Sequence, residues 1–276
     1  MVCVAVTARQ VGAVSVGYSK GFFEDMAVGS LRSAQTVVPM LMELFAPRSV
    51  LDVGCGVGSW LSVFVNAGIG DVLGLDGNYV DRSMLKIDVD LFQPTDLAKP
   101  VSLNRTFDLV LTVEVAEHLA DADSATFVES LTTHGSVIVF SAAIPFQGGT
   151  THVNEQWPSY WIDLFAKQGF VCLDVLRPRL WLNAEVDYWY AQNLLVFVSD
   201  DEYQRRNLSA LVEASEQFNG LPLVHPGLHL ARAESLLSPT MGFRANVREI
   251  HSVLMNLGRL IGHLPASLQR TLRKRG

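Results

Sequence analysis

The segment Ser49-Val-Leu-Asp-Val-Gly-Cys-Gly-Val-Gly-Ser-Trp60 joins a short apolar run to three alternating glycines. The apolar run is typical of a buried strand, and Gly54, Gly56 and Gly58 predict a tight turn directly after it. Such a turn lets the backbone approach a ligand where any Cβ would collide, and a helix that begins near Ser59 would direct its free N–H groups to the same place. The segment therefore predicts a strand, a ligand-binding turn and a helix in succession.

A second apolar run, Asp71-Val-Leu-Gly-Leu-Asp76, ends in a carboxylate. Asp76 follows the glycines by about 20 residues, the position at which nucleotide sites of open α/β sheets hold ribose hydroxyls. We therefore expect Asp76, with Gly77 beside it, to bind a ribose. The alternative is an aspartate on a solvated loop.

Strand and helix signals alternate along most of the chain, beginning with a helix whose apolar residues recur at helical spacing. This alternation predicts an α/β fold with a largely parallel sheet, helices on both faces, and ligands at the carboxyl ends of the strands. The predicted segments are 31–45, 49–53, 60–66, 72–76, 108–113, 122–131, 137–141, 158–168, 170–175 and 192–199.

The composition changes after Asp201, where two amphipathic stripes follow within 208–218 and 247–261. The stripes have no obvious partner in the helix layers of the sheet, so they predict a subunit contact in a homo-oligomer. The chain ends in a basic tip, which is either a solvated end or a contact for an anionic partner. The expected domains are an N-terminal arm (1–30), the α/β domain (31–200) and a C-terminal helical extension (201–276).

Composition excludes several classes of protein. The 276 residues are 49% hydrophobic, which is ample for a packed core. With 28 acidic against 21 basic residues, the net charge of −7 argues against a long nucleic acid as partner. The three cysteines have no C-x-x-C spacing, which argues against a disulfide framework and favours the cytoplasm. The apolar N-terminus lacks a basic region and is interrupted by Arg9, so no membrane span is expected.

The glycine pattern is G-x-G-x-G and differs from the dinucleotide fingerprint G-x-G-x-x-G. With Asp52 before the first glycine, it resembles motif I of the class I S-adenosylmethionine (SAM)-dependent methyltransferases. The run Phe107 to Leu119 is similar to the fourth strand of that family and the loop after it, and Val137 to Ser141 to its fifth strand. The resemblance implies a Rossmann-like sheet of seven strands and SAM as cofactor, bound by Asp52, the glycine turn and Asp76.

The same resemblance assigns a role to Asp96-Leu97. This pair is similar to the acidic and apolar residues that follow the third strand of the family. It implies that the Asp96 carboxylate takes the adenine amino group while Leu97 packs on the ring. Asp88 competes with Asp96 for that role.

Two interpretations fit Glu114-Val-Ala-Glu117-His118, after the fourth predicted strand. In one, Glu114 faces the methionine end of the cofactor, while Glu117 and His118 begin a helix whose positive dipole end suits a carboxylate. In the other, these three and the distant His152 ligate one divalent ion. Carboxylates and imidazoles without thiolates favour a Mg²⁺- or Mn²⁺-like ion.

The four residues are similar to the metal constellation of the small-RNA 2′-O-methyltransferases, and the first three match the metal motif of the ubiquinone-pathway O-methyltransferases. The resemblance implies an ion that binds substrate oxygens and lowers the pKa of the acceptor hydroxyl. Glu155 or Asn154 could substitute for one ligand or assist.

The run His152 to Trp161 is dense in aromatic and amide groups, and Trp181 and 188–190 add further aromatic residues. Such groups suit a sugar ring, which needs an apolar surface and hydrogen-bonding partners, although they are also ordinary core residues. Arg32 either pairs with the cofactor carboxylate or lies on a helix surface.

The sequence therefore predicts a SAM-dependent O-methyltransferase that acts on a hydroxyl of a small polar, sugar-containing molecule or glycan. The expected catalytic residues are Glu117, His118 and His152, with His152 as general base or fourth metal ligand. One alternative is an N- or C-methyltransferase of a natural product that needs no metal. The other is a non-catalytic SAM-binding partner subunit.

Overall fold

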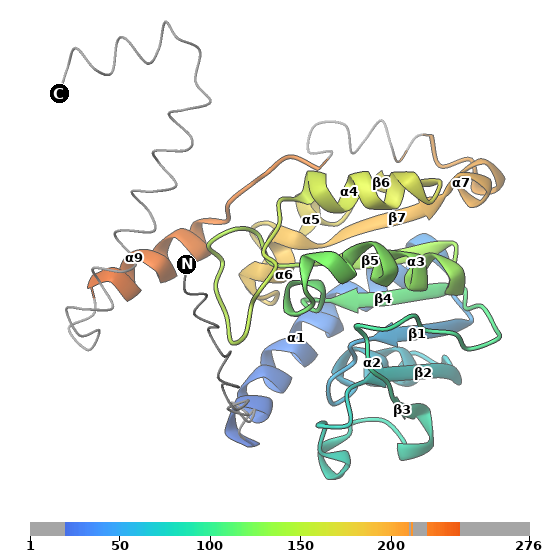
Figure 1. Ribbon diagram of the computed structural model, residues 1–276, viewed down its shortest axis with the longest axis horizontal. Coiled ribbons are helices and arrows are strands. Elements are labelled where there is room, and N and C mark those ends of the chain that lie inside the picture. Colours follow the sequence, from blue (N-terminus) through green and yellow to red (C-terminus); the bar gives the residue numbers. More distant parts are fainter. Residues whose placement is uncertain (1–19, 210, 212–219, 238–276) are drawn as a thin grey trace, which may run out of the picture. The chain divides into compact units, whose positions relative to one another are not determined.

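The computed structural model describes residues 20–209, 211 and 220–237 (Figure 1). The chain divides into two compact units between Leu223 and Val224. In the second unit the described element is helix α9 (Pro226–Leu237). Within the described part of the chain, no helix combines the length and the apolar character that a bilayer crossing needs.

A sheet of seven strands in the order β3-β2-β1-β4-β5-β7-β6 forms the centre of the first unit (Figure 1). The pairings are parallel except those of β7, which is antiparallel to both β5 and β6. This topology confirms the predicted Rossmann-like sheet. The strands are β1 (Ser49–Val53), β2 (Asp71–Asp76), β3 (Phe92–Pro94), β4 (Leu109–Val113), β5 (Val137–Ser141), β6 (Phe170–Leu173) and β7 (Leu195–Ser199).

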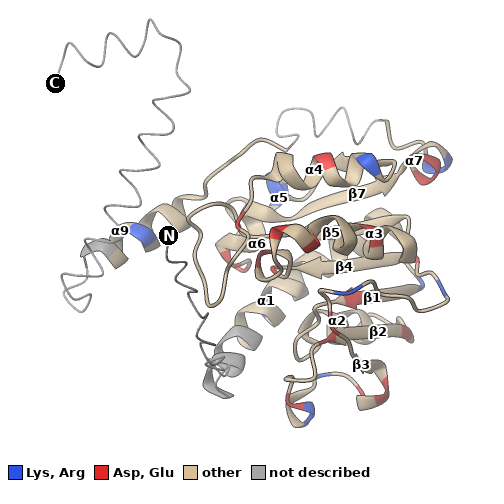
Figure 2. Cartoon of the chain, viewed as in Figure 1, with Lys and Arg blue, Asp and Glu red and all other residues tan. Residues whose placement is uncertain are grey.

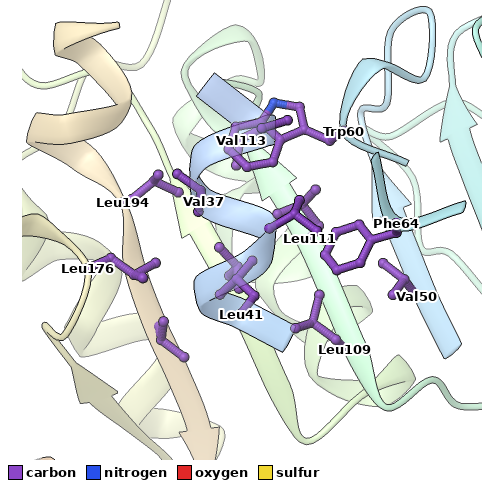
Figure 3. Packing of buried hydrophobic residues seen from close by; sticks show 14 of the residues in the cluster. Val37, Leu41, Val50, Trp60, Phe64, Leu109, Leu111, Val113, Leu176 and Leu194 are labelled. Atoms are coloured by element: carbon purple, nitrogen blue, oxygen red, sulfur yellow. The ribbon is translucent and has the colours of Figure 1, made fainter. Parts of the chain in front are cut away.

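Two apolar clusters fill the two faces of the sheet because neighbouring residues of a strand point to opposite faces. On β1, Val50 packs in one cluster with α1 and α2, whereas Leu51 packs in the other with α3 and α4. Figure 3 shows residues of the first cluster, which include Val37 and Leu41 of α1 and Leu109 and Leu111 of β4. The helices are α1 (Lys20–Phe45), α2 (Ser59–Asn66), α3 (Ser124–His134), α4 (Pro158–Lys167), α5 (Arg177–Leu180), α6 (Tyr188–Asn193) and α7 (Asp200–Arg206).

Several predicted boundaries were wrong. Helix α1 begins at Lys20, so residues 20–30 belong to a helix and not to an N-terminal arm. Gln192 and Asn193 end α6, so the last predicted strand begins later, at Leu195. The three-residue edge strand β3 was not predicted, because so short an element has no periodicity.

Helix α7 belongs with the sheet and not with a C-terminal extension. Its N-terminus is capped by Ser199, whose Oγ accepts from the Glu202 N–H, and Arg206 Nη1 donates to the carbonyl of Phe45 at 3.0 Å. Leu208 is buried in the first cluster, so the first amphipathic stripe begins on the core of its own domain. The stripe within 247–261 and the basic tip lie outside the described residues.

A buried ion pair fixes α6 against the end of β6. Arg177, at the start of α5, pairs with Asp174, and both side chains are buried. Arg177 Nη1 also donates to the carbonyl of Leu221 at 3.0 Å and to that of Gln192 at 3.4 Å. This contact holds the last turn of α6, which carries residues of the site described below.

Candidate active site

A cavity of about 920 Å³ opens at the carboxyl ends of the parallel strands. It lies where the chain order reverses, since β1 is followed outward by β2 and β3, and β4 then returns to the other side of β1. Open α/β sheets bind their ligands at such a switch point. Its walls are the turn after β1, the segments after β2, β3, β4 and β5, and helix α6.

The glycine turn has the conformation that its sequence predicts. Gly54, Gly56 and Gly58 all have positive φ, at 86°, 54° and 78°. A Cβ on Gly54 would lie 2.3 Å from a methyl group of Val115, whereas a Cβ on Gly56 would meet no atom within 4 Å. Gly54 therefore allows the close packing of two loops, and Gly56 leaves open space at the cavity wall.

Two predicted cofactor residues lie outside the cavity. Gly58 is the N-terminal cap of α2 and shapes the turn without lining the cavity. Asp52 is fully buried within β1, and neither carboxylate oxygen accepts a hydrogen bond from the described residues. Burial, together with the nearby carboxylate of Asp76, raises the pKa of Asp52 well above its ordinary value. Asp52 therefore lies behind the cavity wall and does not line the space in which the cofactor is expected to bind.

Asp76 lies at the end of β2 and lines the cavity. Its Oδ2 accepts the Gly56 N–H at 2.7 Å, and its Oδ1 accepts the Gly77 N–H at 2.6 Å and the hydroxyl of Tyr79. The carboxylate thus joins the glycine turn to the segment after β2. Tyr79 was not predicted, because a tyrosine three residues beyond a carboxylate carries no distinctive signal.

We expect Asp76→Ala to weaken SAM binding by about 1.5–3 kcal/mol, or roughly 10- to 150-fold in Kd, because charge-assisted hydrogen bonds to the ribose are lost. Calorimetric titration with SAM and with S-adenosylhomocysteine measures the change. Tyr79→Phe is the matched control, since it removes one donor to Asp76 but keeps the carboxylate. Unchanged affinity in Asp76→Ala would mean that another group binds the ribose.

The structure favours Asp96 over Asp88 at the position predicted for adenine. Asp96 and Leu97 both line the cavity, and Asp96 Oδ2 lies 2.8 Å from the Lys99 ammonium. Asp88 instead caps a short 3₁₀ turn, where its carboxylate accepts the Asp90 N–H at 3.1 Å. Asp88 does not line the cavity, so the structure gives the alternative assignment no support.

Glu114 follows β4 in a left-handed conformation, with φ at 54°. Its side chain is held by two amides: Oε2 accepts from Gln147 Nε2 at 2.6 Å, and Oε1 accepts from Asn193 Nδ2 at 3.0 Å. Burial raises the pKa of Glu114, although these bonds oppose the increase. Since both oxygens are engaged, Glu114 stands apart from the other three predicted metal ligands.

Glu117, His118 and His152 are brought together as predicted, with one possible ligand atom from each within 4.8 Å of the others. Glu117 and His118 lie on the 3₁₀ turn Ala116–His118, and helix α3 begins only at Ser124, so the expectation that these residues begin a helix was wrong. Glu117 is completely buried, and neither of its carboxylate oxygens accepts a hydrogen bond of normal geometry from the described residues.

The electrostatics of this cluster follow from its burial. Burial raises the pKa of Glu117 well above its ordinary value, the Glu114 carboxylate raises it further, and nearby backbone N–H groups offset this only in part. Burial also lowers the pKa of His118 to about 4, and His152 contributes to the decrease. His118 is therefore neutral at pH 7. The neutral His118 imidazole therefore brings no positive charge to the buried carboxylate of Glu117, and a bound cation could supply that charge.

His152 lies on the loop after β5, between two carboxylates. Its Nδ1 is 3.0 Å from Glu155 Oε1, and its Nε2 is 4.0 Å from Glu117 Oε1. Its ring packs edge-on against His118, with centroids 4.9 Å apart. Asn154, the other candidate for an assisting ligand, is buried and donates to Ser124 Oγ at 2.9 Å. Its role is therefore structural.

Only some of the predicted aromatic residues reach the cavity. Tyr188, Trp189 and Tyr190 on α6 line it, whereas Trp181 and the tryptophans of 157–161 do not. Arg32 pairs with Asp187 at 2.6 Å and does not line the cavity, so it is a surface residue of α1. Among the described residues that line the cavity there is no lysine or arginine. The part of the chain that connects β4 to α3 carries several acidic residues (Figure 2).

Residues 30–141 match the model of a family described as a methyltransferase domain. The fold is similar to that of the sugar N-methyltransferase KedS8 from Streptoalloteichus, with a TM-score of 0.53 and 18% identity over 71% of this chain and 99% of that one. DesVI from Streptomyces venezuelae has a TM-score of 0.48 and 15% identity over 64% of this chain and 96% of its own.

Magnesium protoporphyrin IX methyltransferase from Synechocystis, solved with bound S-adenosylhomocysteine, has a TM-score of 0.46 and 17% identity over 64% of this chain and 86% of its own. No protein with a curated description matches the sequence significantly. The domain match covers residues 30–141, and the strand order, with a glycine turn and a carboxylate at the switch point, is that of a class I SAM-dependent methyltransferase.

Proposed function

We propose that this methyltransferase transfers the methyl group to a hydroxyl of a small, uncharged polar acceptor that contains a sugar, with the help of a divalent metal ion. The observation that carries the proposal is the cluster of Glu117, His118 and His152 within the cofactor cavity. A buried carboxylate that accepts no hydrogen bond of normal geometry is costly unless a cation or a proton compensates it. Two imidazoles beside it make a cation the better explanation.

The donor set fits Mg²⁺ or Mn²⁺. Glu117 supplies oxygen, His118 and His152 supply nitrogen, and the cluster contains no thiolate. His118 is neutral at pH 7, so its ring nitrogen is available without loss of a proton. A bound ion would supply the positive charge that favours ionisation of the acceptor hydroxyl. Glu114, held by two amides, faces the methionine end of the cofactor instead.

The residues divide the remaining work between binding and orientation. Asp76 would hold the ribose, and Asp96 and Leu97 would hold the adenine, because all three line the β2 and β3 side of the cavity. The sulfonium of SAM provides the methyl group. The acceptor oxygen must lie in line with the methyl carbon and the sulfur, and such positioning accounts for much of the rate of a transfer between two bound molecules.

The cavity walls support an uncharged acceptor. Tyr188 and Trp189 offer aromatic surface on which the apolar face of a sugar ring could stack. The described lining residues include Asp96, Glu114 and Glu117 but no lysine or arginine, so away from the proposed metal ion a phosphate or carboxylate group would meet negative charge without a cationic side chain. This composition argues against a nucleotide or a sugar phosphate as acceptor.

A second candidate needs no metal. His152 and Glu155 form a hydrogen-bonded pair at 3.0 Å, an arrangement in which the imidazole can act as a general base with the carboxylate behind it. Such a base would serve an O-methyltransferase, or an N-methyltransferase that removes the proton of an ammonium acceptor. In this case the unpartnered Glu117 would be protonated, as the increase in its pKa allows.

An acceptor panel tests the proposal. Release of S-adenosylhomocysteine is measured with neutral glycosides, amino sugars, sugar phosphates and nucleotides, each with Mg²⁺ present and with excess chelator. We expect turnover with hydroxyl acceptors that carry no charge, and only with Mg²⁺. Mass spectrometry of the product identifies the methylated atom. Turnover confined to amines would favour the second candidate, and turnover with phosphorylated acceptors would contradict the argument from charge.

A further inference from the structure

We propose that Glu155 is a positioning residue that keeps the proton of the neutral His152 ring on Nδ1, so that the lone pair of Nε2 faces Glu117 and His118. The inference rests on the proposed function in one respect, the use of that lone pair. The assignment of the proton itself follows from the contacts around the ring.

Two carboxylates compete for the single N–H of a neutral imidazole at this position. Glu155 Oε1 is 3.0 Å from Nδ1, which is a hydrogen-bond distance, whereas Glu117 Oε1 is 4.0 Å from Nε2, which is not. The proton therefore goes to Nδ1, where it can be donated to a negatively charged acceptor. Nε2 is then the nitrogen that carries the lone pair.

Glu155 is itself held firmly in place. Its Oε2 accepts the Phe146 N–H at 2.8 Å, and its Oε1 accepts the Gly148 N–H at 2.5 Å. Burial acts to raise the pKa of Glu155, but the hydrogen bonds from His152 and from these two backbone groups outweigh it and lower the pKa. Phe146, Gly148 and Thr151 have positive φ, so the loop depends on such anchors for its shape.

The consequence concerns the ligand set. A histidine ligates a metal, or takes a proton from an acceptor, only through a nitrogen with a free lone pair. Had the proton been on Nε2, it would point toward Glu117 and the ring would offer the cluster a donor instead. A carboxylate behind a ligating histidine commonly sets the tautomer and raises the basicity of the ring, and its loss typically costs about 10- to 100-fold in metal affinity.

The tautomer can be read without metal or turnover. Long-range ¹H–¹⁵N correlation spectra of the histidine rings distinguish a protonated from an unprotonated nitrogen, and we expect the Nδ1–H form for His152. His134 is an internal reference, because its Nε2 accepts the Leu103 N–H at 3.0 Å and its Nδ1 therefore donates to the Ser130 carbonyl. A wild-type His152 that carries its proton on Nε2 would overturn the inference.

Variants then test the cause. In Glu155→Ala, the Nδ1 proton loses its acceptor, so His152 should change to the Nε2–H form while the His134 signals stay unchanged. Glu155→Gln keeps an acceptor oxygen and should retain the wild-type tautomer. Glu129→Ala is the matched control, since Glu129 is exposed on α3 and does not line the cavity. A Glu155→Ala protein that is folded and keeps the Nδ1–H form would overturn the role of Glu155.

Manganese affinity provides the second readout. Calorimetric titration with Mn²⁺ should show affinity reduced about 10- to 100-fold in Glu155→Ala, and much less in Glu155→Gln and Glu129→Ala. Equal affinity in wild type and Glu155→Ala would contradict the positioning role. If no protein binds Mn²⁺ but the tautomer changes as expected, the metal part of the proposed function fails and the positioning role stands. If Glu155→Ala does not fold, the wild-type and Glu155→Gln spectra still decide the tautomer.

Discussion

Excess chelator is expected to abolish methyl transfer, and added Mg²⁺ or Mn²⁺ should restore it. The cluster of Glu117, His118 and His152 has two imidazoles, of which that of His118 is neutral at pH 7, and one buried carboxylate. Without a cation it lacks the positive charge that would favour an ionised acceptor oxygen. Release of S-adenosylhomocysteine, measured before chelation, in chelator and after addition of each ion, tests the expectation.

Cofactor binding is the control for that experiment. Asp76 and Asp96 lie at the ends of β2 and β3, away from the 3₁₀ turn that carries Glu117. Calorimetric titration with SAM should therefore give nearly the same affinity in chelator as in Mg²⁺. Full turnover in chelator would refute the metal hypothesis and leave His152 with Glu155 as the base. Loss of both turnover and cofactor binding would show instead that the ion supports the fold of the cavity.

The features that sequence reasoning could predict are those whose signal lies within a short stretch of chain. The glycine turn directly follows β1, and Asp76 is the last residue of the neighbouring strand β2. Both lie at the cavity, as predicted. The cluster of Glu117, His118 and His152 was predictable because β4 and β5 are neighbours, so residues that follow them meet at one edge of the sheet.

The partners of Glu114 could not be predicted in this way. Gln147 and Asn193 lie 33 and 79 residues from it in sequence, and amide side chains at strand and helix ends are too common to carry a signal. Arg32 was ambiguous for the same reason, because its partner Asp187 is 155 residues away. Asp52 was difficult to predict for a different reason. The motif places it near the cofactor, but side chains of a strand alternate between the two faces of the sheet, and that of Asp52 points into the protein.

Glu117→Gln is expected to lower kcat by about 10²- to 10⁴-fold while leaving SAM affinity almost unchanged. Glutamine has the same shape but cannot supply negative charge to a cation, so binding of Mn²⁺ should also be lost. Steady-state kinetics and calorimetric titrations with SAM and with Mn²⁺ measure the three quantities. Glu129→Gln is the matched control, since it makes the same change on the exposed face of α3.

Stability separates loss of function from loss of fold. Because burial raises the pKa of Glu117, its ionisation disfavours the folded state: the protonated form stabilises at low pH, and this contribution is lost as pH rises from the ordinary glutamate value through the raised one. Without metal at pH 7, the free energy of unfolding of Glu117→Gln, measured by urea denaturation, should therefore be no lower than that of wild type. A folded variant with wild-type kcat would mean that the buried carboxylate takes no part in methyl transfer. A variant that is both inactive and less stable would instead assign Glu117 a structural role, because removal of an unpartnered buried charge should not weaken the fold.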